Sequence, residues 1–265
     1  MYRQILVPVQ VPAEVEPLVR FAAQFLEPEG EIRVLHVIPT TTLPEVAREW
    51  RASVNLVVPA HEVGAVLDVK VDPEVRAATD VPGEILESAE AHDVDAIVFT
   101  LRGAHRSRNP FVGHTATALL QHAGADVLVV NRLALATEST PRVLVPTFGA
   151  RPAPRPLALA EEISVKAGGV PVVTLALGGT GGSTSTAPER TSRGVPTVRH
   201  VLTYPGALVG RRRRLPDVIL SAAARERYGL LLVGEEQVAG GSLLTRRFLD
   251  ELFRRAPCPV VAVRA

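Results

Sequence analysis

Short apolar runs alternate with helix-like patterns along the whole chain. In the first half, five runs rich in Val, Ile and Leu are predicted to be strands, because they are short and bounded by turn residues. Three segments between them have apolar residues at a spacing near 3.6 and are predicted to be helices. The predicted strands are 3–9, 31–38, 65–71, 94–100 and 126–131, and the predicted helices are 14–26, 82–92 and 114–123. The stretch 41–58 is ambiguous, with room for one or two helical turns between Pro44 and Ala52.

The second half repeats this scheme. Strands are expected near 142–147, 170–177, 197–203, 229–234 and 258–264, and helices near 154–168, 215–228 and 242–256. Three matches in the same order support a duplication: the segments 5–9, 82–89 and 126–130 recur at 143–147, 216–223 and 259–263. The offset between the copies falls slowly, as expected when two copies differ by small loop deletions. We therefore infer an internal repeat.

Strands that alternate with helices require crossover connections, and these produce a mostly parallel sheet with helices on both faces. The predicted fold class is α/β, with two doubly wound domains, each a five-stranded parallel sheet of strand order 3-2-1-4-5. We expect the domains at 1–133 and 141–265, joined by a linker at 134–140. Ligands of such sheets bind at the carboxyl ends of the strands where the strand order reverses, so the ends of strands one and four are the places to examine.

Composition narrows the classes of function. The 265 residues carry a net charge of +1, which does not indicate a nucleic-acid partner, and no apolar run is long enough for membrane insertion. Cys258 is the only cysteine, so an intramolecular disulfide is excluded, and the histidines show no metal-ligand spacing. With no charged leader before an apolar segment, we expect a cytoplasmic protein without a metal.

Candidate chemistry follows the fourth predicted strand. The segment 100–115 contains Gly103 and Gly113, with His105, Arg106 and Arg108 between them, and a helix follows at once. Glycines let the backbone approach an anion, and a helix N-terminus offers free N–H groups to it. The alternative is a glycine needed for chain turning within a solvated basic loop.

Several motifs together resemble the universal stress protein family. They are the strand ending Val7-Pro8-Val9, the helix start Pro82-x-x-Ile85, and Gly103-x(9)-Gly113 before a helix and a last apolar strand. The whole chain is similar to the family's tandem two-domain members. In that family the glycine motif, where intact, holds the phosphates and ribose of ATP, while an Asp after strand one and an apolar residue ending strand two hold the adenine. The resemblance implies binding of ATP or another adenine nucleotide through Pro8, Gln10, Val37, Thr100, Gly103, Gly113, His114 and Thr115.

The first copy departs from the family pattern at three positions. Thr100 stands where the first glycine is expected, and His114 stands where Ser or Thr is expected, with Thr115 one place later. Gln10 replaces the Asp that holds adenine, which keeps a carbonyl acceptor but removes the charge, so the base remains open.

The second copy has lost the motif. Gly234 matches the first glycine, but Glu236 or Gln237 stands at the second, and Arg246 at the third. Phe148 replaces the Asp. Acidic residues repel phosphate, so we expect the second copy to be a structural partner of the first.

Two other segments have simpler explanations. The run Arg211–Arg214 is expected to be a solvated loop before the helix at Pro216, because no aromatic residues for stacking on nucleic acid accompany it. The glycine-rich loop 178–182 lacks the Gly-Lys-Ser/Thr ending of a phosphate loop and is expected to be mobile.

The leading hypothesis is a non-enzymatic, nucleotide-responsive regulatory protein of the universal stress type. The resemblance implies an intramolecular pseudo-dimer through 126–131 and 258–264, with homodimerisation of the tandem chain as a second interface. The main alternative is an interaction module that binds no nucleotide and docks on a partner such as a membrane transporter. A slow ATPase is a weaker alternative.

Overall fold

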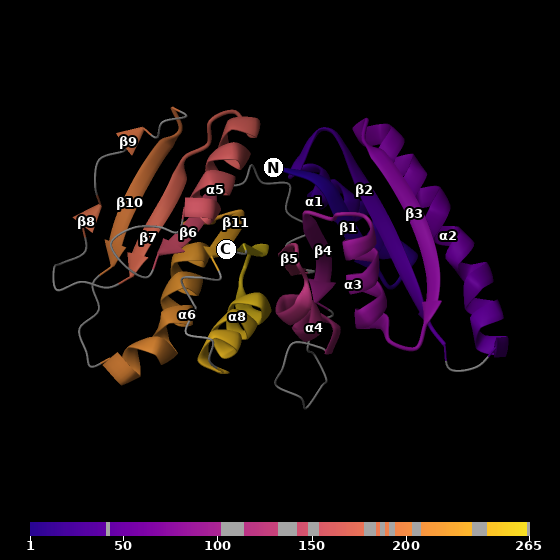
Figure 1. Cartoon of the computed structure of the whole chain (residues 1–265). Helices are drawn as coiled ribbons and strands as arrows, with labels where there is room; N and C mark the ends of the chain where they lie inside the picture. Colours follow the sequence, from indigo (N-terminus) through magenta and orange to yellow (C-terminus); the bar gives the residue numbers. More distant parts are fainter. Residues whose placement is uncertain are drawn as a thin grey trace. The chain divides into compact units, whose positions relative to one another are not determined.

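The computed structural model describes residues 1–40, 43–101, 114–131, 142–147, 154–177, 184–185, 189–190, 194–202, 208–234 and 243–263. Among them, residues up to Leu128 form one compact unit and residues from Val129 form another, so the division falls within the strand Asp126–Asn131, which is described below with the first unit. Both are drawn in Figure 1 with the labels used below. No helix in the described part of the chain combines the length and the apolarity needed to cross a bilayer.

The first unit is a parallel sheet with helices between successive strands. Its strand order is β3-β2-β1-β4-β5, with β1 parallel to β2 and β4, and β2 parallel to β3. This confirms the predicted order 3-2-1-4-5. The elements are β1 (Tyr2–Val9), the 3-10 helix η1 (Pro12–Glu14), α1 (Val15–Ala23), β2 (Leu26–Pro39), α2 (Leu43–Leu67), β3 (Lys70–Ala78), α3 (Val81–Ala91), β4 (Ala96–Leu101), α4 (His114–His122) and β5 (Asp126–Asn131).

The third strand lies later in the chain than the sequence pattern predicts. The predicted strand 65–71 is wrong, because α2 continues to Leu67 and β3 begins only at Lys70. The ambiguous stretch 41–58 belongs largely to this helix, which is 25 residues long and contains Pro59. Its buried positions, Leu56, Ala60, Val63 and Gly64, recur at helical spacing and form the side that packs on the sheet.

The second unit has the same topology. Its strands follow the order β12-β11-β6-β7-β10, so β6 lies between β7 and β11 as β1 lies between β2 and β4. The elements are β6 (Val143–Thr147), α5 (Pro154–Lys166), β7 (Val172–Leu177), β8 (Thr184–Ser185), β9 (Glu189–Arg190), β10 (Pro196–Leu202), α6 (Leu208–Arg225), β11 (Leu230–Gly234), α8 (Leu243–Arg255) and β12 (Val260–Val263).

The repeat extends to the strand register. In the first unit Ile5 pairs with Ile32 and Ala96, and in the second Val143 pairs with Val172 and Leu230. The two sets of strand pairs are equivalent when residue 5 is matched with residue 143, as in the sequence repeat. The structure therefore confirms that the doubly wound topology occurs twice along the chain.

Two features of the second unit differ from expectation. The helix predicted at 215–228 begins earlier, at Leu208, so Arg211–Arg214 lie in its first turns and not in a loop, and Pro216 is inside the helix. The short strands β8 and β9, which pair antiparallel with β10, were not expected. The glycine-rich segment 178–182 and the predicted linker 134–140 lie outside the described residues.

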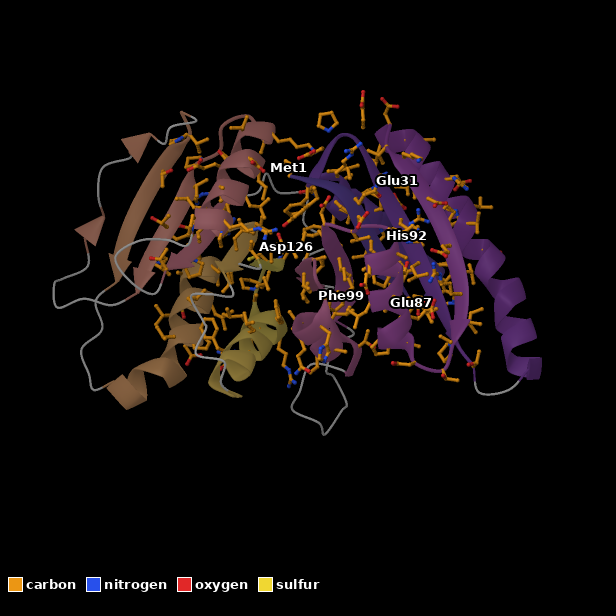
Figure 2. All side chains as sticks on the ribbon, in the orientation of Figure 1. Met1, Glu31, Glu87, His92, Phe99 and Asp126 are labelled. Atoms are coloured by element: carbon orange, nitrogen blue, oxygen red, sulfur yellow. The ribbon has the colours of Figure 1, made fainter. Side chains whose placement is uncertain are left out.

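Helices cover each sheet and side chains fill the layers between them. In the first unit α1 packs against α2 and α3 against α4, and α2 runs beside β3 in Figure 1. Figure 2 shows the side chains of the described residues, and Phe99 of β4, which is labelled there, is buried. At the other end of the sheet from Val9, the hydroxyl of Tyr2 on β1 donates a hydrogen bond of 2.8 Å to Asp126 Oδ2 at the start of β5.

The Tyr2 hydroxyl is expected to contribute measurably to stability. Asp126 is buried, so Tyr2→Phe removes a donor from a buried carboxylate and should lower the free energy of unfolding by about 1–3 kcal/mol. Glu16→Gln serves as the control, because its exposed pair with Arg20 is worth about 0.5 kcal/mol or less. Urea unfolding measures both values, and a Tyr2→Phe loss no larger than that of the control would contradict the expectation.

Candidate functional site

The carboxyl ends of β1, β2 and β4 lie at one edge of the first sheet, because the three strands are parallel neighbours. β1 ends at Val9, which pairs with His36 of β2, and β4 ends at Leu101. Since β1 lies between β2 and β4, this edge contains the point where the strand order reverses. Doubly wound sheets bind their ligands at this point.

A buried carboxylate joins two of these strand ends. Glu14, the last residue of η1, accepts a hydrogen bond of 3.0 Å at Oε2 from the backbone N–H of Gln10, which follows β1. Its Oε1 lies 3.5 Å from the hydroxyl of Thr100 near the end of β4. Glu14 is only 4% exposed. The turn after β1 thus brings a negative charge back to the reversal point.

No ion pair compensates this charge within the described part of the chain. The amino end of α1 follows directly at Val15, and the positive end of its dipole favours a carboxylate there. Burial of a carboxylate is costly without hydrogen bonds or an opposite charge. Among the described residues, the two hydrogen bonds and the helix dipole therefore stabilise the Glu14 carboxylate.

The end of β2 supplies an imidazole and an apolar side chain. His36 Nδ1 lies 3.0 Å from the carbonyl oxygen of Val9, which can only accept, so Nδ1 carries a proton and donates it. The next residue, Val37, is buried. The edge therefore combines carboxylate, hydroxyl and imidazole groups with apolar surface.

The structure brings four of the predicted site residues to this edge, namely Pro8, Gln10, Val37 and Thr100. His114 and Thr115 begin α4, as predicted for the helix after the glycine motif. Gly103 and Gly113, together with His105, Arg106 and Arg108, lie outside the described residues.

Gln10 lies at this edge, directly after β1. Its side chain, which we expect to contact the base, is exposed, and its backbone N–H is bonded to Glu14. The acidic group at this corner is Glu14, which the sequence analysis did not select. Its only signal is its position four residues after Gln10 and directly before a helix, where an acidic residue is also common for dipole reasons. His36 was likewise not selected.

Comparison with known proteins decides the family. A sequence model described as the universal stress protein family matches residues 1–131. Through this first domain, the chain belongs to the universal stress protein family. Membership supports a role in the response to stress. No curated protein matches the sequence.

Solved structures extend the similarity of fold to the whole of this universal stress protein. A universal stress protein from Archaeoglobus fulgidus DSM 4304 is 17% identical, with a TM-score of 0.71 over 99% of this chain and 98% of that one. A protein described as a putative universal stress protein from Pseudomonas aeruginosa UCBPP-PA14 is 12% identical, with a TM-score of 0.64 over 99% and 93%. The cytoplasmic domain of a prokaryotic cation chloride cotransporter is 10% identical, with a TM-score of 0.51 over 99% and 95%. At these identities the comparisons show a common fold.

In the second unit of this universal stress protein, different side chains lie at the corresponding carboxyl edge. By strand register, Thr147 takes the position of Val9, and Gly234 that of Thr100. The Thr147 hydroxyl is buried and donates to the carbonyl oxygen of Leu175 at 3.4 Å, so it is used within the sheet. Among the described residues of this unit, the buried acid is Glu161, which lies inside α5 and not before it. Phe148, Glu236 and Gln237 lie outside the described residues, and Arg246 is on α8.

Cys258 is part of the core of the second unit. It is 3% exposed, and burial raises the pKa of its thiol to about 12. At pH 8 only about one thiol in 10,000 is then ionised, and the thiolate is the nucleophile. The cysteine is therefore unsuited to nucleophilic chemistry.

Cys258 should be protected from alkylation in the folded protein. We expect iodoacetamide at pH 8 to modify the native chain at least about 100-fold more slowly than the chain unfolded in guanidinium, because both the thiolate and its access are suppressed. Mass spectrometry measures this as a single mass increment, since the chain has one cysteine. Native and unfolded chains that react at the same rate would show that Cys258 is accessible.

Proposed function

We propose that this universal stress protein is a non-enzymatic regulator whose first domain binds ATP or a related adenine nucleotide at the carboxyl edge of its sheet. The observation that carries the proposal is that the strand ends at this edge and the segment after β4 contain different kinds of residue. The described strand ends supply Glu14, Thr100, His36 and Val37, which suit a neutral ligand part that donates hydrogen bonds. The basic residues and glycines follow β4 in the segment 102–113.

This separation favours a ligand with two chemically different ends. A phosphate beside the Glu14 carboxylate would be repelled, more strongly than in water because the carboxylate is buried. The start of α4, at His114, is the better place for phosphate, since free N–H groups and the helix dipole favour anions there. A nucleotide, with its base and ribose toward β1 and its phosphates toward α4, satisfies both conditions.

Calorimetry of the ligand-free protein with ATP, ADP and AMP tests the proposal. We expect binding by the wild type and a loss of at least about tenfold in Gly113→Arg, because a large side chain there blocks the backbone approach that an anion needs. Gly124→Arg is the matched control: it adds the same side chain and charge to the same domain, at a position where a Cβ atom would have no heavy atom within 4 Å. It should bind nucleotide like the wild type.

Absence of heat with millimolar nucleotide would contradict the proposal, as would equal loss of binding in the two arginine variants. We propose binding without turnover. Release of phosphate from ATP by the wild type, reduced in Gly113→Arg, would contradict that part and favour the ATPase alternative.

The second candidate function is docking on a membrane transporter without nucleotide. The observation that favours it is the similarity of fold, over almost the whole of both chains, to the cytoplasmic domain of a cation chloride cotransporter. Under this alternative the chain would bind to a transport protein as a separate subunit, whereas the cotransporter carries its cytoplasmic domain within its own chain.

Affinity purification from detergent-solubilised membranes distinguishes the two functions. The docking alternative predicts that a transport protein is retained equally with and without ATP, and equally by the wild type and Gly113→Arg. Retention that requires ATP, or that Gly113→Arg abolishes, would instead tie any partner to the nucleotide site.

A further inference from the structure

The helix α6 of the second unit begins earlier than its counterpart in the first. The repeat matches Pro216 with Pro82, the second residue of α3, but α6 already begins at Leu208. Residues 208–214 therefore precede the point at which α3 starts, and as a helix they are about 10 Å long. Figure 1 shows these first turns beyond the arrowheads of β7 and β10, on the carboxyl side of the sheet.

The charge of this extension opposes local helix stability. It contains Arg211–Arg214 and no acidic residue. Like charges that are close on a helix repel one another, and the positive end of the helix dipole lies among them. In α3 the first turn contains Glu84, the sign of charge that the dipole favours. A segment that breaks a local preference in this way is typical of a functional surface.

A second helix adds positive charge on the same side of the sheet. β6, β7, β10 and β11 are parallel, so α8, which follows β11, also begins at the carboxyl edge. Arg246 and Arg247 lie in its first two turns. α8 packs against α6, and Arg255 Nη2 donates a hydrogen bond of 2.7 Å to Oδ1 of Asp217, the single acid of α6. The acid of α6 is thus paired with α8.

The concentration of charge belongs to these two helices and not to the chain in general. α6 and α8 together contain nine arginines and three acidic residues, a net charge of +6, whereas the whole chain carries +1. Their counterparts α3 and α4 contain three glutamates and neither lysine nor arginine, a net charge of −3. Equivalent elements of the two repeats therefore carry opposite charge.

We infer that the amino-terminal turns of α6 and α8, a basic end formed by Arg211–Arg214, Arg246 and Arg247, bind the surface of an anionic membrane. Clusters of arginine are attracted by anionic lipid headgroups, and a helix that projects past a sheet edge suits a flat partner. The chain does not insert, because the apolar side chains that pack α6 and α8, such as Ile219 and Phe253, are buried.

The composition of the basic end favours a membrane over a nucleic acid. Residues 208–215 are only Leu, Val, Gly and Arg, so no amide or hydroxyl group there accompanies the arginines to read base edges. The same residues include no aromatic side chain on which a base would stack. Recognition by charge alone suits a surface of uniform negative charge.

Co-sedimentation of the full-length, untagged chain with lipid vesicles tests the inference. The wild type should bind vesicles that contain about 30 mol% phosphatidylglycerol in phosphatidylcholine, and should not bind vesicles of phosphatidylcholine alone. Binding should weaken at least about tenfold between roughly 0.05 and 0.3 M salt, because the interaction is electrostatic. The assay contains no nucleotide, so its result is independent of the proposed function.

Two double variants separate the basic end from the net charge of the chain. Arg211→Glu with Arg212→Glu should bind the anionic vesicles at least about tenfold more weakly. It should unfold at a temperature no lower than that of the wild type, because glutamate is favoured at a helix start. Arg20→Glu with Lys70→Glu is the control, with side chains 46% and 72% exposed in the first unit. Both variants change the net charge from +1 to −3, but the control should bind within about threefold of the wild type.

Four results would contradict the inference. They are no binding to anionic vesicles, equal binding to neutral vesicles, equal loss in the two variants, and tighter binding of short duplex DNA than of anionic vesicles at the same salt concentration. The last would assign the basic end to nucleic acid. Self-association of the wild type without vesicle binding, abolished by Arg211→Glu with Arg212→Glu in sedimentation experiments, would also contradict it and assign the basic end to acidic residues of a second copy.

Discussion

The first strand of each copy is buried on both faces, and this constraint determines the rest of the architecture. Ile5, Leu6 and Val7 in β1 are fully buried, and in β6 Val143, Leu144 and Val145 are at most 1% exposed, so side chains of both faces are covered. A strand that is apolar on both faces needs helices on both sides of its sheet, and crossover connections supply them. Later strands are added on both sides of this first strand, so the strand order reverses beside it. Ligands of such sheets bind at this reversal point, and the burial of the first strand therefore determines where a ligand can bind.

The two copies share this buried first strand but have different side chains at the carboxyl edge of the sheet. In the first, the turn after β1 returns a carboxylate to the edge, where Glu14 connects Gln10 with Thr100. In the second, the equivalent strand ends in Thr147, whose hydroxyl bonds to the neighbouring strand at Leu175. A group left with spare acceptor capacity favours a ligand, whereas a group satisfied inside the sheet does not. The duplication therefore keeps one scaffold and, in our account, one site.

The sequence was sufficient for the repeat, the strand order and most element positions, because continuous apolar runs bounded by turn residues identify buried parallel strands. It failed at α2 and β3. The apolar residues near Val66 and Leu67 end a helix that includes Pro59, and a short apolar run does not distinguish a buried helix from a strand. It also extended α1 to residue 26, although β2 begins at Leu26.

The site was less predictable than the fold. Pro8, Val37 and Thr100 were implied by the resemblance to the family, and the strand ends place them at the carboxyl edge of the sheet. Glu14 could not be found in this way. An acidic residue before a helix is usually explained by the helix dipole, and only the path of the η1 turn brings its carboxylate to Gln10 and Thr100.

The central claim is that one of two similar units holds the ligand. Native mass spectrometry of the full-length chain with excess ATP measures the number of nucleotides bound per chain directly. The account predicts a single bound nucleotide per chain. Two bound nucleotides would contradict the asymmetry between the copies, and none would contradict the site itself.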